Sequence, residues 1–336
     1  MKVFELNPGF GLENLTLADR PTPQPGPGQV LLKIRAVSVN YRDLLLVKGV
    51  YNPRQKLPLI PLSDAAGEVV GVGAGVTRFR VGDRALNQFF PHWLEGPARD
   101  EKLSDAAGSE TDGVAAQFRV FAESALAPIP DYLDFAEAAT LPCAALTAYS
   151  AIVTLGQVSA NDVVLIQGTG GVAIFALQFA KLQGATAMIT SSSDAKLERA
   201  SALGADFTIN YMREPEWGSA ARKFNGGRGL DLIVEIGGAA TLDRSLRAVR
   251  AGGMVALIGV VSGAQQSINL PLILMRQVRL QGVTVGSRAG LEAMLAEMNR
   301  AKLRPVIDRV FAFDQLRTAL GQMELGGHFG KIVLEL

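Results

Sequence analysis

A glycine-rich turn stands between an apolar run and a helix-like segment, and its residue types suit phosphate binding. The turn reads Gly168-Thr169-Gly170-Gly171-Val172. Gly168 permits a sharp turn that a Cβ atom would obstruct, and Gly170 lets the backbone approach a pyrophosphate. The unpaired N–H groups and the positive end of a helix that begins near Gly170 attract a phosphate group. The turn therefore predicts a dinucleotide site, although glycine turns also join strands to helices without binding anything.

The surrounding pattern favours the dinucleotide interpretation over a purely structural turn. Apolar runs alternate with helix-like segments at the spacing of a doubly wound parallel sheet. The expected strands cover residues 163–167, 186–190, 207–209, 232–236 and 255–259. We expect Gly237, Gly259 and Val260, which end the fourth and fifth of these strands, to lie at the crevice where such sheets bind ligands.

The end of the second expected strand indicates which nicotinamide cofactor is bound. Sites specific for NAD usually carry Asp or Glu about 20 residues past the glycine turn. The corresponding position here is Ser191, followed by Ser192. A carboxylate would repel a 2′-phosphate, whereas small hydroxyl groups leave room and donate hydrogen bonds. The serines predict NADPH over NADH; the alternative is a serine-rich turn without this role.

Composition excludes several classes of protein. The 336 residues suggest about two domains, and a net charge of +1 makes nucleic acid an unexpected partner. The single cysteine, Cys143, excludes an internal disulfide and any zinc site built from several thiolates. The chain shows neither a signal-peptide core nor an apolar run of about 20 residues, so we expect a cytoplasmic protein without a membrane partner.

The two ends of the chain differ in character from its middle. Residues 1–125 alternate short apolar strands with proline and glycine, which suggests a small irregular β-barrel. The tail 287–336 shows the same mixed pattern, so we expect it to return to this first domain. We expect the middle segment, 126–286, to form the nucleotide-binding domain. The long loop 87–113 is either a surface flap or the wall of a binding cleft.

Taken together, several motifs resemble those of the zinc-independent medium-chain dehydrogenases/reductases, in the quinone oxidoreductase and alcohol-dehydrogenase-like branch. Besides the glycine turn they are Asn40-Tyr41-Arg42-Asp43, Ser63–Val70, Val81–Arg84, Leu141–Ala148 and His328–Leu334. The resemblance implies an α/β fold with a GroES-like β-barrel catalytic domain and a Rossmann doubly wound parallel-sheet domain. It also implies a homodimer formed through edge strands, here Leu280 to Val285. By chemistry alone, that strand could equally be covered by its own chain.

One departure from related enzymes bears on metal binding. Zinc alcohol dehydrogenases resemble this chain but carry a cysteine ligand where Asn40 stands and a histidine where Ser63 stands. Neutral amide and hydroxyl groups do not replace thiolate or imidazole as tight zinc ligands, and Cys143 alone cannot rebuild the site. We therefore expect no metal.

The resemblance also assigns catalytic candidates. Asn40 matches a residue that lines the nicotinamide pocket, where its amide could donate to a developing oxyanion; its alternative role is to form a turn. Tyr51 matches a tyrosine that donates a proton in related enoyl thioester reductases, or simply packs a loop. Tyr41 and Asp43 are weaker candidates for the same pocket.

Further cofactor contacts follow from the same resemblance. Thr147 matches a helix residue near the nicotinamide carboxamide, and Lys196 and Tyr211 match residues that contact the 2′-phosphate. Lys331 either reaches the cofactor or is solvated. We expect an NADPH-dependent oxidoreductase that transfers hydride to a quinone or an α,β-unsaturated carbonyl. The alternatives are a zinc-free alcohol dehydrogenase or carbonyl reductase, and a non-catalytic NADPH-binding redox sensor.

Overall fold

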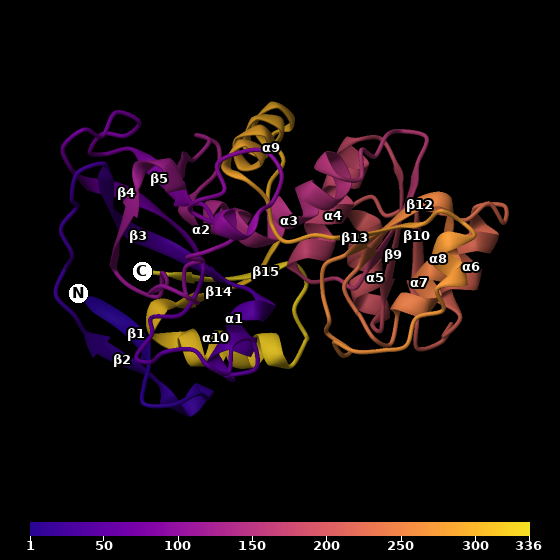
Figure 1. The fold of residues 1–336 in the computed structure, drawn as a ribbon, viewed down its shortest axis with the longest axis horizontal. Helices are drawn as coiled ribbons and strands as arrows, with labels where there is room; N and C mark the ends of the chain where they lie inside the picture. Colours follow the sequence, from indigo (N-terminus) through magenta and orange to yellow (C-terminus); the bar gives the residue numbers. More distant parts are fainter. The chain divides into compact units, whose positions relative to one another are not determined.

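The computed structural model describes residues 1–336. The chain forms two compact units, shown in Figure 1. The first unit contains Met1–Leu146 and Val285–Leu336, and the second contains Thr147–Thr284. No helix is both long enough and apolar enough to cross a bilayer.

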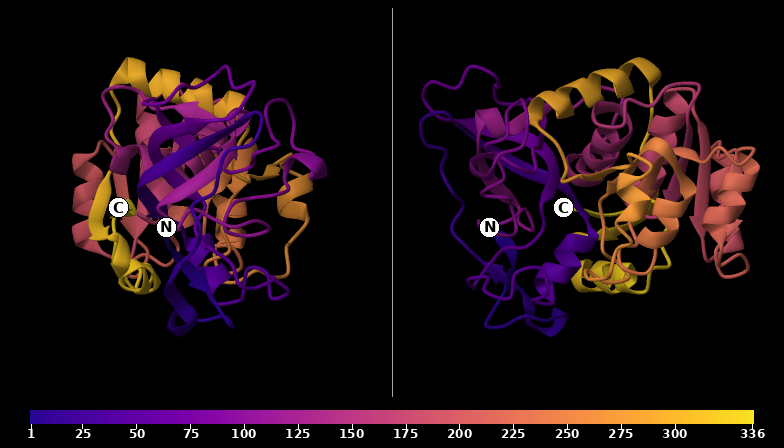
Figure 2. Two further views of the ribbon diagram at one scale, coloured as in Figure 1. Left: turned by 90° about the vertical axis from the view of Figure 1, so that its left-hand side faces the viewer. Right: turned by 45° about the vertical axis from the view of Figure 1, so that its right-hand side comes forward.

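The second unit is built on a six-stranded parallel sheet with the strand order β10-β9-β8-β11-β12-β13. The strands are β8 (Val163–Gln167), β9 (Thr186–Ser191), β10 (Phe207–Asn210), β11 (Leu230–Glu235), β12 (Val249–Leu257) and β13 (Arg279–Gly282). The helices are α4 (Gly171–Leu182), α5 (Asp194–Ala202), α6 (Trp217–Phe224), α7 (Leu242–Ala248) and α8 (Pro271–Leu274). Helix α4 covers one face of the sheet, and α6 and α7 cover the other (Figures 1 and 2). The predicted doubly wound sheet is confirmed.

Burial explains why the central strand reads as a continuous apolar run. Every residue of β8 is buried, because helices cover the sheet on both faces. On one side, Leu165 and Ile233 pack with Trp217 and Leu246 in a single apolar cluster. The strand order reverses at β8, which has β9 on one side and β11 on the other. Doubly wound sheets bind their ligands at such a switch point.

The first unit contains a seven-stranded sheet and a separate two-stranded one. Its strands are β1 (Lys2–Leu6), β2 (Leu15–Asp19), β3 (Gln29–Val39), β4 (Asp64–Val72), β5 (Arg84–Asn87), β6 (Phe118–Ala122), β7 (Leu126–Pro128), β14 (Ile307–Ala312) and β15 (Lys331–Glu335). Its helices include α1 (Tyr41–Val47), α2 (Phe135–Ala139), α9 (Arg288–Ala301) and α10 (Leu316–Glu324). The C-terminal strand β15 pairs with β3, so the tail returns to the first unit as expected.

The long strand β3 organises the first unit. It pairs antiparallel with β4 and β15 and, along its first half, with β6. The carboxyl end of β3 therefore lies between the first residues of β4 and β15. This arrangement brings three segments that are far apart in the sequence to one place.

The structure differs from the sequence pattern around residue 126. We expected the second domain to begin there, but β7 pairs with β5 and α2 packs on β3, both within the first unit. The helical stretch past Pro142 does continue, but not as one α-helix. Two π-helical turns, Leu141–Ala145 and Ser150–Thr154, flank the short helix α3 (Leu146–Tyr149).

The loop 87–113 is tied to other parts of the first unit. The backbone N–H groups of Arg288 and Ala289, at the start of α9, donate to the carbonyl oxygens of Trp93 and Leu94 at 2.8 and 2.9 Å. The Gln88 side chain donates to the Trp93 carbonyl at 2.6 Å. These bonds hold the aromatic part of the loop in a defined position.

Candidate functional site

The glycine turn joins β8 to α4 in the way a dinucleotide site requires. Gly170 caps α4, whose first-turn N–H groups therefore face the turn. Gly168 adopts φ 76°, a left-handed conformation that residues with a Cβ atom rarely adopt. No atom lies within 4 Å of where its Cβ would stand. Glycine is thus required here by backbone conformation, and not by crowding as the sequence argument held.

The ends of β9 and β10 bring together the residues expected at the 2′-phosphate. Ser191 pairs in register with Asn210, and the Tyr211 N–H donates to the Ser191 carbonyl at 3.1 Å. Ser191 is buried, whereas Ser192 and Tyr211 are exposed. Lys196 lies one turn away, where its N–H donates to the capping Ser193 hydroxyl of α5.

Sequence reasoning missed a basic residue beside this cluster. Arg213, which follows β10, lies 2.5 Å from the Asp194 carboxylate at the start of α5. Asn210 donates to the same carboxylate oxygen at 2.7 Å. The Asp194 charge is therefore compensated locally. The signal in the sequence was a basic residue two positions after Tyr211.

A second missed feature is a buried polar network at the carboxyl ends of β8 and β11. Gln167 donates to the Glu235 carboxylate at 2.7 Å, and its own carbonyl oxygen accepts from the N–H groups of Ile236 and Gly237 at 3.1 Å. The Glu235 carboxylate also accepts from the Gly238 N–H at 2.9 Å and from the hydroxyls of Thr241 and Ser245. The signal in the sequence was that each of these buried strands ends in a polar residue, Gln167 in β8 and Glu235 in β11.

This network shapes the loop in which Gly237 was predicted to contact the cofactor. The Ser262 N–H and hydroxyl both donate to the Gly237 carbonyl at 2.7 Å, which links the loops after β11 and β12. A Cβ at Gly259 would lie 2.5 Å from the Ile236 carbonyl oxygen, so only glycine fits there. Val260 is half-exposed next to it. Thr147, the remaining candidate in the second unit, is buried in α3.

The first unit holds a separate buried cluster, which we call the polar cluster, consisting of Asn40, Ser63, Asp64 and Lys331. Register explains its assembly. Ser38 faces Asp64 on β4, and Val39 faces Ile332 on β15, so Asn40 follows β3 at the point where both neighbouring strands begin. All members of the cluster are at most 7% exposed.

Hydrogen bonds connect the polar cluster from one end to the other. The Lys331 ammonium donates to Asn40 Oδ1 at 2.5 Å and to the Val39 carbonyl at 2.8 Å. Asn40 Nδ2 donates to Ser63 Oγ at 3.4 Å, and Ser63 Oγ donates to Asp64 at 2.6 Å. The other Asp64 oxygen accepts from the Cys143 N–H at 3.0 Å. Lys331 is therefore buried, and the expectation that it is solvated is wrong.

Burial controls the charges in this cluster. It raises the pKa of Asp64, and the positive charge of Lys331 opposes that rise. Burial likewise lowers the pKa of Lys331, and Asp64 opposes that shift. Burial also raises the pKa of the Cys143 thiol, with a smaller contribution from the Asp64 carboxylate. The thiol is thus protonated at neutral pH.

The other catalytic candidates lie around helix α1. Asp43 is fully buried and accepts from the Asn40 N–H at 2.8 Å, which completes the helix cap. It also pairs with Arg42 at 3.0 Å, and the Arg42 guanidinium lies 4.9 Å from the ring centre of Tyr51. Tyr51 and Tyr41 are 50% and 41% exposed, so both residues are at the surface of this unit. Asp43 thus has a structural role in the cap.

The residues of the polar cluster do not fit a zinc ion. No group of three or more His, Cys, Asp or Glu side chains is placed to hold a metal ion. At the position of the family's cysteine ligand, Asn40 accepts a hydrogen bond from an ammonium group. His92 pairs with Asp105 at 2.8 Å within the loop 87–113 and is not part of the cluster.

Comparison with known proteins identifies the family. A model of the GroES-like domain of alcohol dehydrogenases matches residues 26–131, and a model described as zinc-binding dehydrogenase matches residues 171–300. A zinc-type alcohol dehydrogenase-like protein of Schizosaccharomyces pombe is 40% identical over 97% of this chain and 96% of its own length.

Solved structures agree with this match. A putative alcohol dehydrogenase from Sinorhizobium meliloti is 40% identical, with a TM-score of 0.93 over 100% of this chain and 98% of the other. A structure named as an NAD-dependent alcohol dehydrogenase is 33% identical, with a TM-score of 0.92 over 100% of both chains. The chain is a member of the medium-chain dehydrogenase/reductase superfamily, an oxidoreductase of the zinc-type alcohol-dehydrogenase-like group with a GroES-like domain and a Rossmann-type domain.

Proposed function

We propose that this enzyme is an NADPH-dependent reductase that transfers hydride to a quinone or an α,β-unsaturated carbonyl compound without a catalytic zinc ion. The observation that carries the proposal is the bond from Lys331 to Asn40 Oδ1 at the position of a zinc ligand. A divalent cation at that place would be repelled by the ammonium group. The proposal therefore assigns the stabilisation of developing charge to hydrogen-bond donors and not to a Lewis acid.

Asn40 is the residue we propose to stabilise the developing anion. The reduced nicotinamide, when bound, supplies the hydride. Addition of the hydride to a carbon of the conjugated substrate places negative charge on the substrate's carbonyl oxygen. The Lys331 ammonium fixes the Asn40 carbonyl, so Nδ2 is held as the donor and the amide is polarised. Nδ2 donates to Ser63 Oγ at a long 3.4 Å, and a hydrogen bond from the Asn40 amide also lowers the pKa of Asp64. A substrate oxygen would compete with these two acceptors for the amide, and we expect it to do so as negative charge develops on it.

Tyr51 is the proposed proton donor to the enolate or enolate-like product. Arg42 lies against its ring, which positions the side chain, and the residue is half-exposed. Positioned general acids typically contribute about 100-fold or more to a rate. If Tyr51 has this role, Tyr51→Phe lowers turnover of enones by about that factor while the ring stays packed on Arg42. Equal rates for the two proteins would exclude Tyr51 as the acid.

The serine cluster supports NADPH as the cofactor. Ser191 stands where NAD sites carry a carboxylate, and Lys196, Tyr211 and Arg213 surround the same strand ends. Small hydroxyl groups and cations suit a 2′-phosphate, which carries up to two negative charges. One similar structure is named as NAD-dependent, so the cofactor is the first property to measure.

The direct test mixes the purified enzyme with NADPH or NADH and a panel of benzoquinones and enones, and follows absorbance at the nicotinamide band. We expect oxidation of NADPH that is faster than that of NADH and is unaffected by prior treatment with a chelator. No turnover with any acceptor would refute the reductase proposal. Loss of activity on chelation, with recovery on adding zinc, would refute zinc independence. Tight NADPH binding without turnover would instead indicate a redox sensor.

A second candidate is reduction of ordinary carbonyl compounds or oxidation of alcohols. The names of the similar proteins favour it, because both solved structures above are described as alcohol dehydrogenases. Without zinc, an ordinary alkoxide would need a stronger acid than the residues described here. Adding aliphatic aldehydes and alcohols to the panel separates the candidates, since the reductase proposal expects them to react more slowly than enones.

We also propose a homodimer through β13. This strand ends the six-stranded sheet, so its outer edge carries unpaired backbone groups. It covers Arg279–Gly282 and is shorter than the expected 280–285. Light scattering coupled to size-exclusion chromatography checks the proposal, and a monomer at micromolar concentration would contradict it.

A further inference from the structure

The first unit contains a small cavity that the proposed reaction does not use. Its volume is about 270 Å³, near the lower end of the range for small-molecule sites. Apolar side chains form most of its lining, including Phe89, Pro91 and Phe121. Neither Asn40 nor Tyr51 lines it, so it is separate from the polar cluster.

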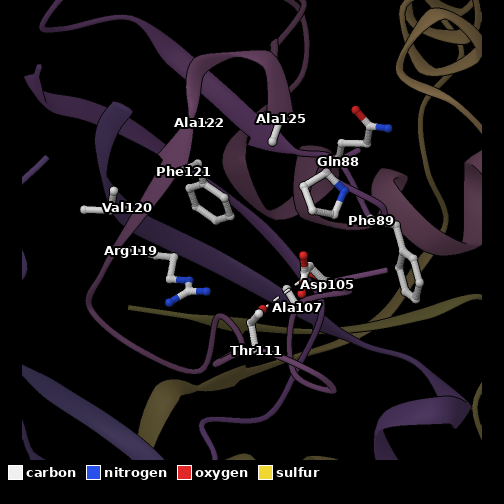
Figure 3. A pocket seen from close by; sticks show the side chains of 11 residues that line it. Gln88, Phe89, Asp105, Ala107, Thr111, Arg119, Val120, Phe121, Ala122 and Ala125 are labelled. Carbon is white, nitrogen blue, oxygen red and sulfur yellow. Dashed lines mark hydrogen bonds between the residues drawn. The ribbon is translucent and has the colours of Figure 1, made fainter. Parts of the chain in front are cut away.

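A cation without a partner faces this cavity. Arg119 lies on β6, two residues before Phe121, so both side chains are on the same face of the strand. In Figure 3, Arg119 and Phe121 lie on one side of the cavity and Phe89 lies on the opposite side. The Arg119 Nε–H is buried and has no hydrogen-bond partner. A buried donor without an acceptor destabilises a folded protein unless a ligand satisfies it.

The neighbouring carboxylates do not supply the missing acceptor. Asp112 is close enough for its charge to act on Arg119, but its oxygens are bonded to Arg20 at 2.7 Å and to the Ile60 N–H at 3.0 Å. Asp105, which also lines the cavity, is bonded to His92. The Arg119 Nε–H therefore has no acceptor among the residues around it.

Two further features of the lining suggest a binding site. Gln88 is 2% exposed, and its buried Oε1 atom also has no partner. Asp105 adopts φ 59°, an unusual conformation for a residue other than glycine. Buried polar atoms without partners and unfavourable backbone conformations are both concentrated at ligand sites. Here they occur on residues of the same cavity.

We propose that this cavity binds a small organic monocarboxylate with an apolar body, through a charge-assisted bond to Arg119. The planar guanidinium group matches a carboxylate in shape and charge. The apolar lining accommodates a ring or a short alkyl chain. A dianion such as a phosphate monoester is disfavoured, because only one cation faces the cavity and the Asp105 and Asp112 carboxylates are near it.

Calorimetric titration of the full-length protein with benzoate, without nicotinamide cofactor, tests the site. We expect benzoate to bind the wild type, and to bind Arg119→Gln at least tenfold more weakly. The matched control is Arg35→Gln, on neighbouring β3, where the arginine pairs with Glu68 and does not line the cavity; its affinity for benzoate should be unchanged. Benzamide, which has the same shape without the charge, should bind much more weakly than benzoate.

Three results would overturn the proposal. They are no benzoate binding by the wild type, equal benzoate binding by Arg119→Gln, and tighter binding of phenyl phosphate than of benzoate. Thermal unfolding of Arg119→Gln checks that the fold is intact, and we expect no loss of midpoint because Arg119 makes no protein hydrogen bond through its buried Nε. Since the titration needs neither NADPH nor turnover, its result is independent of the proposed reductase activity.

Discussion

The two candidate regions of this enzyme are built on different principles. At the cofactor end of the second unit, the main features are backbone ones: the left-handed Gly168, the start of α4 and the ends of adjacent parallel strands. In the first unit, the polar cluster consists of side chains just after β3 and at the starts of β4 and β15, which bond to one another in the interior. The first region uses residues that are close in sequence, and the second joins residues up to 291 positions apart.

This difference has energetic consequences. A backbone site tolerates many side chains and depends on a few glycine conformations, so most substitutions there affect cofactor binding more than folding. A buried cluster of charges depends on mutual compensation, because removing one partner leaves another charge buried without a counterpart. We therefore expect substitutions in the polar cluster to affect stability first and binding second.

The largest effect is expected for Lys331→Met. The change leaves Asn40 Oδ1 and the Val39 carbonyl without their donor and removes the positive charge near buried Asp64. Breaking a buried charge pair typically costs about 3–5 kcal/mol of unfolding free energy. Denaturant unfolding followed by fluorescence measures this cost.

The matched control is Lys2→Met, which removes an exposed lysine paired with Asp19 at 2.6 Å. An exposed, solvent-screened pair contributes little to stability, so the control should unfold almost as the wild type does. The double variant Lys331→Met/Asp64→Asn should recover part of the loss. A cost below about 1 kcal/mol for Lys331→Met would show that the cluster is not held by its charges.

A pH effect of somewhat smaller size is expected from Asp43. Burial raises its pKa to about 6, although Arg42 partly opposes the rise. The folded protein therefore binds this proton more tightly than the unfolded chain, whose Asp pKa is near 3.8. Relative to Asp43→Asn, the wild type should lose unfolding free energy as pH rises from about 4 to 6, by up to ~3 kcal/mol, and change little above that. Parallel denaturant titrations at several pH values check the sign; a difference that grows with pH would contradict it.

In the second unit, Gly168→Val tests the backbone site. Valine is strained at φ 76°, so the turn should open or shift, and the dissociation constant for NADPH should rise about 30-fold, or about 2 kcal/mol. Gly282→Val is the control, because that glycine has an ordinary φ and open space where its Cβ would stand. Unchanged NADPH affinity in Gly168→Val would mean that the turn does not hold the pyrophosphate.

The same contrast explains what the sequence could reveal. The glycine turn and the strands β8 to β12 follow local patterns, and the parallel sheet is as expected. Lys331 was a candidate by position, but its bond to Asn40 depends on strand register across the whole first unit. Glu235 was missed because a carboxylate ending an apolar strand looks solvated until its donors on β8 and α7 are known. The unpaired Arg119 had no local signal at all.

The smallest effect is expected for Ser191→Asp, which asks whether side chains tune the backbone site. The existing carboxylate at this edge, Asp194, is compensated by Arg213, so a second carboxylate at 191 would be uncompensated and would repel a 2′-phosphate. We expect the preference for NADPH over NADH, measured as the ratio of kcat/KM values, to fall about tenfold, or about 1.4 kcal/mol. Ser201→Asp adds the same charge at the far end of α5 and should leave the ratio unchanged. If the two variants behave alike, selectivity does not reside at the end of β9, and the cations Lys196 and Arg213 would be the next residues to replace.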